Sequence, residues 1–170
     1  MKFIRQVGLK MLEEVSGLLK KRLKGKRFGL IGVGNSFRMD DGAGPRLIEL
    51  LAGKVSFPLV DASEVPENYS SWIIKKALDV VIFVDAVGFD GEPGEVRFIP
   101  IDDLMVSASS THRLSLHFMI KYMKQQWSGE AILIGIQPAR TDLENELSPA
   151  VGESVKRLAK IFIEIDSRVQ

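Results

Sequence analysis

Residues 28–44, with the sequence FGLIGVGNSFRMDDGAG, carry most of the information about the fold. The apolar run 28–33 has the length of a buried strand, and the glycines and aspartates that follow it indicate a loop. Pro45 suits the first turn of a helix, where its missing N–H is not needed. The stretch therefore predicts a strand, a loop that presents Asp40 and Asp41, and then a helix.

The loop has the glycines of a nucleotide-binding turn but not their spacing. Gly32 and Gly34 match the first two positions of G-x-G-x-x-G, whereas Phe37 stands where the third glycine is required. No Gly-Lys-Ser/Thr follows, and the carboxylates of Asp40 and Asp41 would repel a phosphate. The pattern favours a cation site or acid–base chemistry, and a nucleotide-binding domain stays as the less favoured alternative.

Strands and helices alternate along the rest of the chain. The expected strands are 28–33, 57–60, 80–84, 96–101 and 131–136. The expected helices are 3–23, 44–51, 66–78, 111–127 and 149–165. This alternation predicts an α/β three-layer sandwich with a mostly parallel, twisted sheet of about five strands, helices on both faces and an extra N-terminal helix. The strand at 96–101 follows a turn cluster and is expected near an edge.

The N-terminal part differs in charge from the rest. Residues 1–26 are expected to form a basic amphipathic helical extension, and 27–170 a single α/β domain. Residues 1–27 hold nine Lys and Arg against two Glu, a net charge of +7, so the remainder carries −6. A solvated helix face or docking of these opposite charges explains the asymmetry better than a nucleic-acid or membrane partner, because no aromatic residues interleave the basic ones.

Composition excludes several classes of protein. The 170 residues include no Cys, so disulfides, thiolate nucleophiles and zinc–thiolate sites are all excluded. No apolar stretch approaches the length of about 20 residues that a transmembrane helix needs. The first residues lack the short apolar region and cleavage site of a signal peptide, so a cytoplasmic protein is expected.

Polar side chains gather where the strands of the predicted sheet end. Asp40 and Asp41 follow the first strand, Asp61 ends the second, Asp85 ends the third, and His112 enters a helix from a polar loop. Ligands of open α/β sheets bind at this edge. Two carboxylates with one imidazole suit Ni, Zn, Fe or Mn, and the imidazole discriminates against Mg and Ca.

Simpler interpretations stay open for each of these residues. Asp85 is alternatively a turn residue, and Asp41 is alternatively a helix cap. His117 lies about 140° round the helix from His112, so it is expected to pack or to lie at the surface rather than to share a metal. The serines at 109–110 are weak candidates for a nucleophile, since no Gly-x-Ser-x-Gly elbow exists.

Five separated segments together resemble one family, the nickel–iron hydrogenase maturation endopeptidases. The segments are Gly32 to Gly44, Val84-Asp85-Ala86, Thr111-His112-x-x-x-Leu116, Gly135-Ile136-Gln137-Pro138 and Leu147-Ser148-Pro149-Ala150-Val151. They occur in the expected order and spacing over about residues 27–165. Residues 61–68 are most similar to the type that processes the large subunit of formate-hydrogenlyase hydrogenases.

The resemblance implies an endopeptidase that removes a C-terminal extension from the hydrogenase large-subunit precursor after nickel insertion. It implies that Asp41, Asp85 and His112 are both the metal contacts and the catalytic residues. The metal would be nickel, supplied by the precursor rather than permanently bound. Such a site makes cleavage conditional on nickel, which polarises the scissile carbonyl or lowers the pKa of a bound water.

Substrate-binding residues and a role for the N-terminal helix are also expected. Asn35, Asp61 and Glu64 are expected to bind the substrate, with Asp40 in a supporting role. Family members usually begin close to the first strand, so the extra helix is a departure, and we expect it to mediate self-association or hydrogenase docking. A non-catalytic chaperone that binds the metal or the precursor remains the alternative function.

Overall fold

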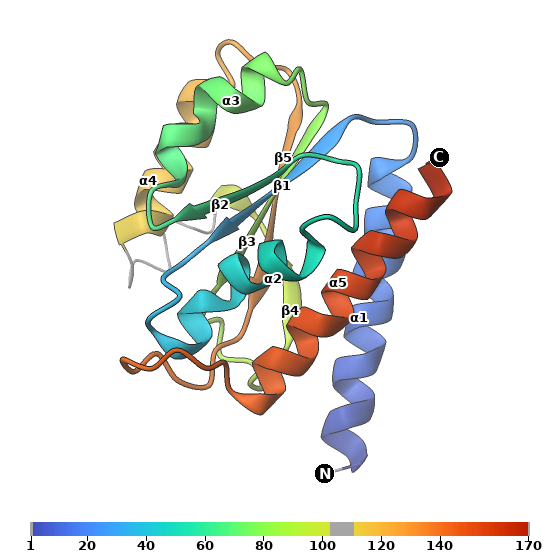
Figure 1. Cartoon of the computed structure of the whole chain (residues 1–170), viewed down its shortest axis with the longest axis vertical. Coiled ribbons are helices and arrows are strands. Elements are labelled where there is room, and N and C mark those ends of the chain that lie inside the picture. The colour runs from blue at the N-terminus through green and yellow to red at the C-terminus, as the bar shows by residue number, and fades with distance from the viewer. Residues whose placement is uncertain (1, 103–110, 170) are drawn as a thin grey trace.

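The computed structural model describes residues 2–102 and 111–169, without the side chains at 2–10, 111–113, 168 and 169. The described residues form one five-stranded sheet of order β2-β1-β3-β5-β4 (Figure 1). Its strands are β1 (Phe28–Val33), β2 (Leu59–Ser63), β3 (Val80–Ala86), β4 (Val96–Ile99) and β5 (Glu130–Ile136). The first four strands of that order are parallel, and β4 pairs antiparallel with β5 at one edge. The predicted mostly parallel sheet is confirmed.

Helices cover both faces of this sheet, as predicted (Figure 1). One face carries the long helices α1 (Lys2–Leu23) and α5 (Pro149–Val169) with α2 (Ala43–Leu51). The other carries α3 (Ser70–Lys75) and α4 (Thr111–Met123). Two short 3₁₀ turns, η1 (Met39–Gly42) and η2 (Pro66–Tyr69), lead into α2 and α3.

The central strand β3 is buried along its whole length. Ile82 and Val84 pack among residues of α1, α2 and α5, whereas Val81 and Phe83 pack among residues of α3 and α4. This alternation explains the continuous apolar run in the sequence, because a strand covered on both faces needs apolar side chains at every position. By the same alternation, Asp85 points to the side of α3 and α4.

The helix α1 packs on its own sheet domain. Leu19 and Leu23 are buried in the same cluster as Leu158 and Phe162 of α5. Figure 1 shows α1 and α5 side by side, and an ion pair of 3.3 Å joins Lys20 to Glu164. The apolar stripe of the described part of α1 is thus covered within one chain, and self-association through its basic face stays a prediction.

Two predicted helices end earlier than the sequence pattern indicated. The helix expected over 66–78 is split into η2 and the shorter α3, and α3 ends at Lys75, just before Ala77 with its left-handed φ of 48°. The helix expected over 111–127 ends at Met123. Beyond it the chain turns, and the indole N–H of Trp127 donates to the carbonyl of Leu78 at 2.7 Å.

The predicted second strand, 57–60, is also displaced, and the observed β2 runs from Leu59 to Ser63. It pairs with β1 through Gly32, opposite Asp61, and the register then shifts before Val33. The predicted edge strand is β4, which ends at Ile99. Within residues 2–102 and 111–169, no helix has the length and apolar character to cross a membrane.

Candidate functional site

The order of the strands creates a crevice between β1 and β3. The chain leaves β1 through α2 to reach β2 on one side, and α3 then brings it back to β3 on the other side of β1. A topological switch of this kind opens a ligand site at the carboxyl ends of the two central strands. Asp41 follows β1, and Asp85 is the last residue but one of β3. Both predicted carboxylates therefore lie at the switch point.

The first turn of α2 rests directly on the ends of both strands. A Cβ added to Gly44 would lie 2.4 Å from the carbonyl oxygens of Val33 and of Val84, closer than any real contact. Only glycine fits there. This close packing fixes the start of α2, and with it the loop that carries Asp41, against β1 and β3.

Gly34 lies between the two carboxylate residues. Its φ of +129° is a conformation that favours glycine, and a Cβ there would lie 1.8 Å from the backbone oxygen of Asp41. The same Cβ would lie 3.7 Å from a carboxylate oxygen of Asp85. Asp85 is fully buried, and Asp41 is half-buried, with its Oδ2 accepting the N–H of Asn35 at 3.0 Å. The fold thus brings Asp41 and Asp85 together around Gly34.

Two residues with a strained backbone lie beside this pair. Met39 has a φ of 43° and Ser63 a φ of 48°, both in the left-handed region that costs a non-glycine residue about 1 kcal/mol or more. Hydrogen bonds hold both residues in place. The Met39 N–H donates to the carbonyl of Glu144 at 2.7 Å, and the Gly34 N–H donates to the carbonyl of Ser63 at 2.8 Å.

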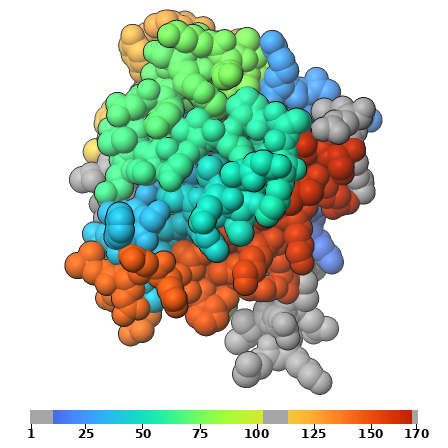
Figure 2. Space-filling model, in the orientation of Figure 1, coloured from blue at the N-terminus to red at the C-terminus, as the bar shows by residue number. Residues whose placement is uncertain are grey.

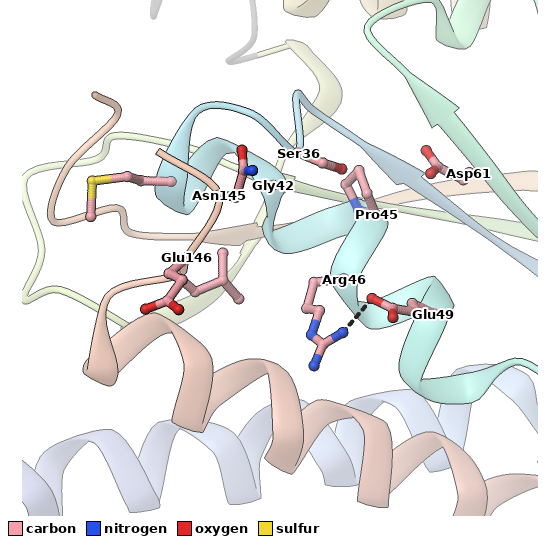
Figure 3. Close-up of a pocket in the computed structure, with 10 residues that line it drawn as sticks. Ser36, Gly42, Pro45, Arg46, Glu49, Asp61, Asn145 and Glu146 are labelled. Carbon is pink, nitrogen blue, oxygen red and sulfur yellow. Dashed lines mark hydrogen bonds and ion pairs between the residues drawn. The ribbon is translucent and has the colours of Figure 1, made fainter. Parts of the chain in front are cut away.

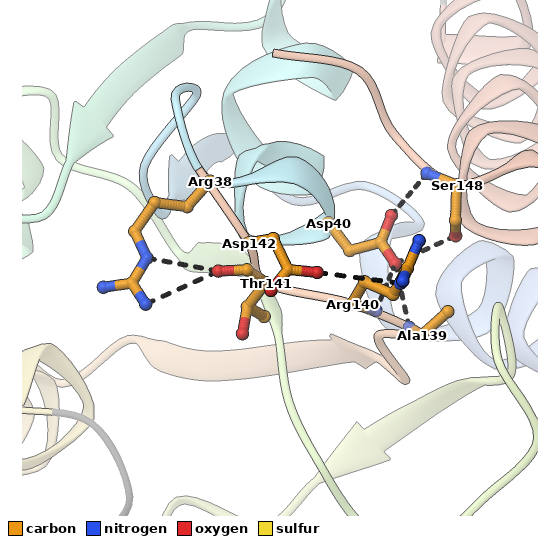
Figure 4. Close-up of polar contacts among 7 residues, drawn as sticks. All are labelled: Arg38, Asp40, Ala139, Arg140, Thr141, Asp142 and Ser148. Atoms are coloured by element: carbon orange, nitrogen blue, oxygen red, sulfur yellow. Dashed lines mark hydrogen bonds and ion pairs between the residues drawn. The ribbon is translucent and has the colours of Figure 1, made fainter. Parts of the chain in front are cut away.

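Asp40 ties this loop to the connection between β5 and α5, residues 137–148 (Figure 4). Its fully buried carboxylate accepts the N–H groups of Ala139, Arg140 and Ser148 at 2.8, 3.1 and 2.7 Å, and the Ser148 hydroxyl at 2.9 Å. The supporting role predicted for Asp40 therefore has a definite form. It orders the backbone of a distant segment, whereas its neighbour Asp41 accepts the N–H of Asn35.

The Arg38 guanidinium adds a contact to the same connection, donating from Nε to the carbonyl of Thr141 at 3.4 Å (Figure 4). Figure 2 shows the orange 137–148 connection on the surface directly beside the loop that precedes α2. The sequence indicated none of these contacts, although Ser148 belongs to one of the five segments that resemble the family.

The predicted substrate-binding residues lie at the same edge of the sheet. The Asn35 amide nitrogen donates to a carboxylate oxygen of Glu64 at 3.0 Å, and its oxygen accepts the N–H of Phe37 at 2.9 Å. The carboxylate of Asp61 accepts the N–H of Ser63 at 2.8 Å. These contacts join the loop after β1 to the end of β2.

The third predicted ligand, His112, lies in the first turn of α4, and its side chain is outside the described residues. The serines at 109–110 lie wholly outside the described residues. Among side chains that the structure does describe, no three of His, Asp and Glu converge as a metal site. His117 is buried, with Nδ1 3.1 Å from the carbonyl of Ile101, so the prediction that it packs is confirmed.

Gln137, from the segment that follows β5, supports the turn after β3. Its Oε1 accepts the N–H groups of Phe89 and Gly91 at 2.8 and 3.3 Å. The chain beyond Asp85 is thereby held against the end of β5. This gives the Gly-Ile-Gln-Pro segment a structural role close to the crevice.

Sequence comparison agrees with this architecture. The profile of the hydrogenase maturation protease family matches residues 45–165. The chain belongs to this family, whose members are peptide hydrolases.

Individual relatives give the same result. The hydrogenase 3 maturation protease of Escherichia coli (strain K12) is 38% identical over 112 residues, 64% of this chain and 71% of that protein. The crystal structure of the NiFe hydrogenase maturation protease HycI from Thermococcus kodakarensis KOD1 matches with a TM-score of 0.78 and 36% identity, over 88% of this chain and 99% of that one. The solution structure of the endopeptidase HycI from Escherichia coli matches with a TM-score of 0.69 and 30% identity, over 78% and 86%.

Proposed function

We propose that the chain removes the C-terminal extension of a nickel–iron hydrogenase large-subunit precursor once nickel has been inserted. One observation carries the proposal. Asp41 and Asp85 flank Gly34 at the switch point of the sheet, and His112 lies in the first turn of α4. Membership of the maturation protease family supports the class of reaction.

The chemistry of the donors suits nickel that the precursor already holds. Two carboxylate oxygens and one imidazole nitrogen are ligands that divalent transition ions accept, and they leave coordination positions open. The chain has no Cys to complete a shell of its own. The precursor would supply the remaining ligands with the ion, so that cleavage follows nickel insertion.

Each residue has a separate role in this proposal. Asp85, buried in the rigid end of β3, holds a fixed position toward the ion. Asp41 is more exposed, and its Oδ2 is bound to the Asn35 N–H, so it can meet the incoming substrate chain. His112 completes the set, and bound nickel would polarise the scissile carbonyl or acidify a water. Asn35, Asp61 and Glu64 would contact the substrate chain, and the reaction would take place in the cytoplasm.

The test compares nickel-loaded with nickel-free precursor as substrates for the purified protein. We expect cleavage of the loaded precursor only, and loss of that cleavage in His112→Ala. Asp142→Asn is a suitable control because it changes an exposed carboxylate outside the crevice. Equal cleavage of both precursors, or full activity of His112→Ala, would contradict the proposal. Nickel-dependent binding without cleavage would favour the chaperone alternative.

A further inference from the structure

A cavity of about 500 Å³ lies on the α2 side of the loop that carries Asp41 (Figure 3). Its walls include Ser36 and Gly42, on either side of Asp41 in the sequence, and residues 145–147 of the 137–148 connection. The volume falls in the range of about 300–1,000 Å³ that is typical of ligand pockets. We call it the α2 cavity.

The α2 cavity combines three apolar side chains with acidic ends. Met39, Pro45 and Leu147 contribute apolar surface. Figure 3 shows Asp61 at one end, from β2, and Glu146 at the other, from the connection before α5. Within the part of the chain that the structure describes, neither of these two carboxylates forms an ion pair.

The other two charges of the cavity offset each other. Arg46 and Glu49 lie one turn apart on α2 and form an ion pair (Figure 3). The remaining charge of the cavity is therefore negative, which complements a cationic side chain. A cavity with apolar lining residues and such ends fits an extended peptide that carries a basic residue.

The cavity and the Asp85 carboxylate lie on opposite sides of the sheet edge. Asp85 points to the face of α3 and α4, whereas the cavity is lined by α2 and the end of the connection to α5. A substrate chain that crosses this edge past Asp41 would keep its scissile bond in the crevice. The residues beyond that bond would enter the cavity. A flexible terminal extension can enter a cavity of this size, whereas a folded domain cannot.

We infer that the α2 cavity binds the C-terminal extension of the precursor as an extended peptide with a basic side chain between Asp61 and Glu146. This inference rests on the proposed function. It makes the cavity the place where this chain distinguishes its own substrate, separate from the residues around Gly34 that act on the peptide bond.

The lack of cysteine allows a direct test by site-specific crosslinking. Asn145→Cys introduces a single thiol at the exposed wall of the cavity, and Ser128→Cys introduces a control thiol before β5, at the opposite edge of the parallel strands. Each variant is labelled with a benzophenone maleimide, freed of reagent and illuminated with the nickel-loaded precursor of the same organism's hydrogenase. We expect the probe at position 145 to crosslink to the C-terminal extension of the precursor. The probe at position 128 should form no crosslink to it.

A charge reversal tests the basic side chain. Glu146→Lys is expected to raise the KM for precursor cleavage about tenfold with kcat unchanged, because the lost attraction acts on binding alone. Glu164→Lys makes the same charge change on the exposed side of α5, outside the lining of the cavity, and should leave KM unchanged. An unchanged KM in Glu146→Lys would overturn the assignment of a basic residue.

The outcomes separate the two proposals. Cleavage by the wild type with crosslinks only in the precursor body would overturn the cavity assignment and leave the proposed function intact. Crosslinks in the extension without cleavage by the wild type would overturn the proposed function and leave the cavity assignment intact. If the wild type cleaves no precursor and no crosslink forms in the extension, both proposals are overturned.

Discussion

The carboxylate of Asp40 accepts both the backbone N–H and the hydroxyl of Ser148, at 2.7 and 2.9 Å, across 108 residues of sequence. This pair fastens the loop after β1 to the residue before α5. The proposed catalytic Asp41 and the wall of the α2 cavity therefore depend on the same buried carboxylate.

The first prediction concerns stability. Asp40→Ala should lower the free energy of unfolding by about 3 kcal/mol or more, because it leaves several backbone N–H groups without their acceptor at about 1–3 kcal/mol each. Ser148→Ala removes one hydroxyl donor only and should cost about 1 kcal/mol. Urea denaturation measures both. A loss below 1 kcal/mol in Asp40→Ala would show that the connection is held by other contacts.

A second prediction concerns Gly34. Alanine there must shift the Asp41 backbone, because its Cβ would lie 1.8 Å from that carbonyl oxygen. We expect Gly34→Ala to lose about 2 kcal/mol of stability and about 100-fold in the rate of precursor cleavage. Gly53→Ala is the matched control, since φ there is +73° but no atom lies within 4 Å. It should cost about 1 kcal/mol and no activity. Equal activity of the two variants would contradict the geometry described for Gly34.

Asp85 provides a third prediction, which separates folding from catalysis. Asp85→Asn keeps the volume of this buried side chain, so the variant should stay folded. Precursor cleavage should fall at least about 100-fold, since a neutral amide is a poor ligand for a divalent ion. A folded Asp85→Asn protein with wild-type cleavage would remove Asp85 from the site. Circular dichroism and a precursor cleavage assay give the two readouts.

The fourth prediction compares two neighbouring leucines of α1. Leu19 is fully buried, whereas Leu18 is 44% exposed. Leu19→Ala should therefore cost about 2–5 kcal/mol of unfolding free energy, and Leu18→Ala less than about 0.5 kcal/mol. The same denaturation measurement applies to both. Similar small losses would mean that α1 unfolds separately from the sheet domain.

Local patterns were enough to predict β1, β3 and the positions of Asp41 and Asp85. A continuous apolar run identifies a buried strand, and a polar residue at its end lies at the carboxyl edge of the sheet. The family resemblance is confirmed by the match over residues 45–165. The metal and catalytic assignments stay predictions, because the side chain of His112 lies outside the described residues.

What the sequence did not indicate depends on partners far along the chain. The four acceptor contacts of Asp40 reach residues 99 to 108 positions away, and no local pattern encodes them. The early end of α3 depends on the left-handed Ala77 and on Trp127, whose indole binds the next loop. The α2 cavity likewise forms from three separated segments.

The contact between Asp40 and Ser148 also has a consequence for synthesis on the ribosome. Most of the chain must emerge before Ser148 can reach Asp40, and β4 lacks its neighbour until β5 has been made. Contacts of such long sequence separation form late in folding. A nascent chain that ends before α5 therefore carries Asp41 on an unfastened loop, and peptidase competence arrives only near the completion of translation.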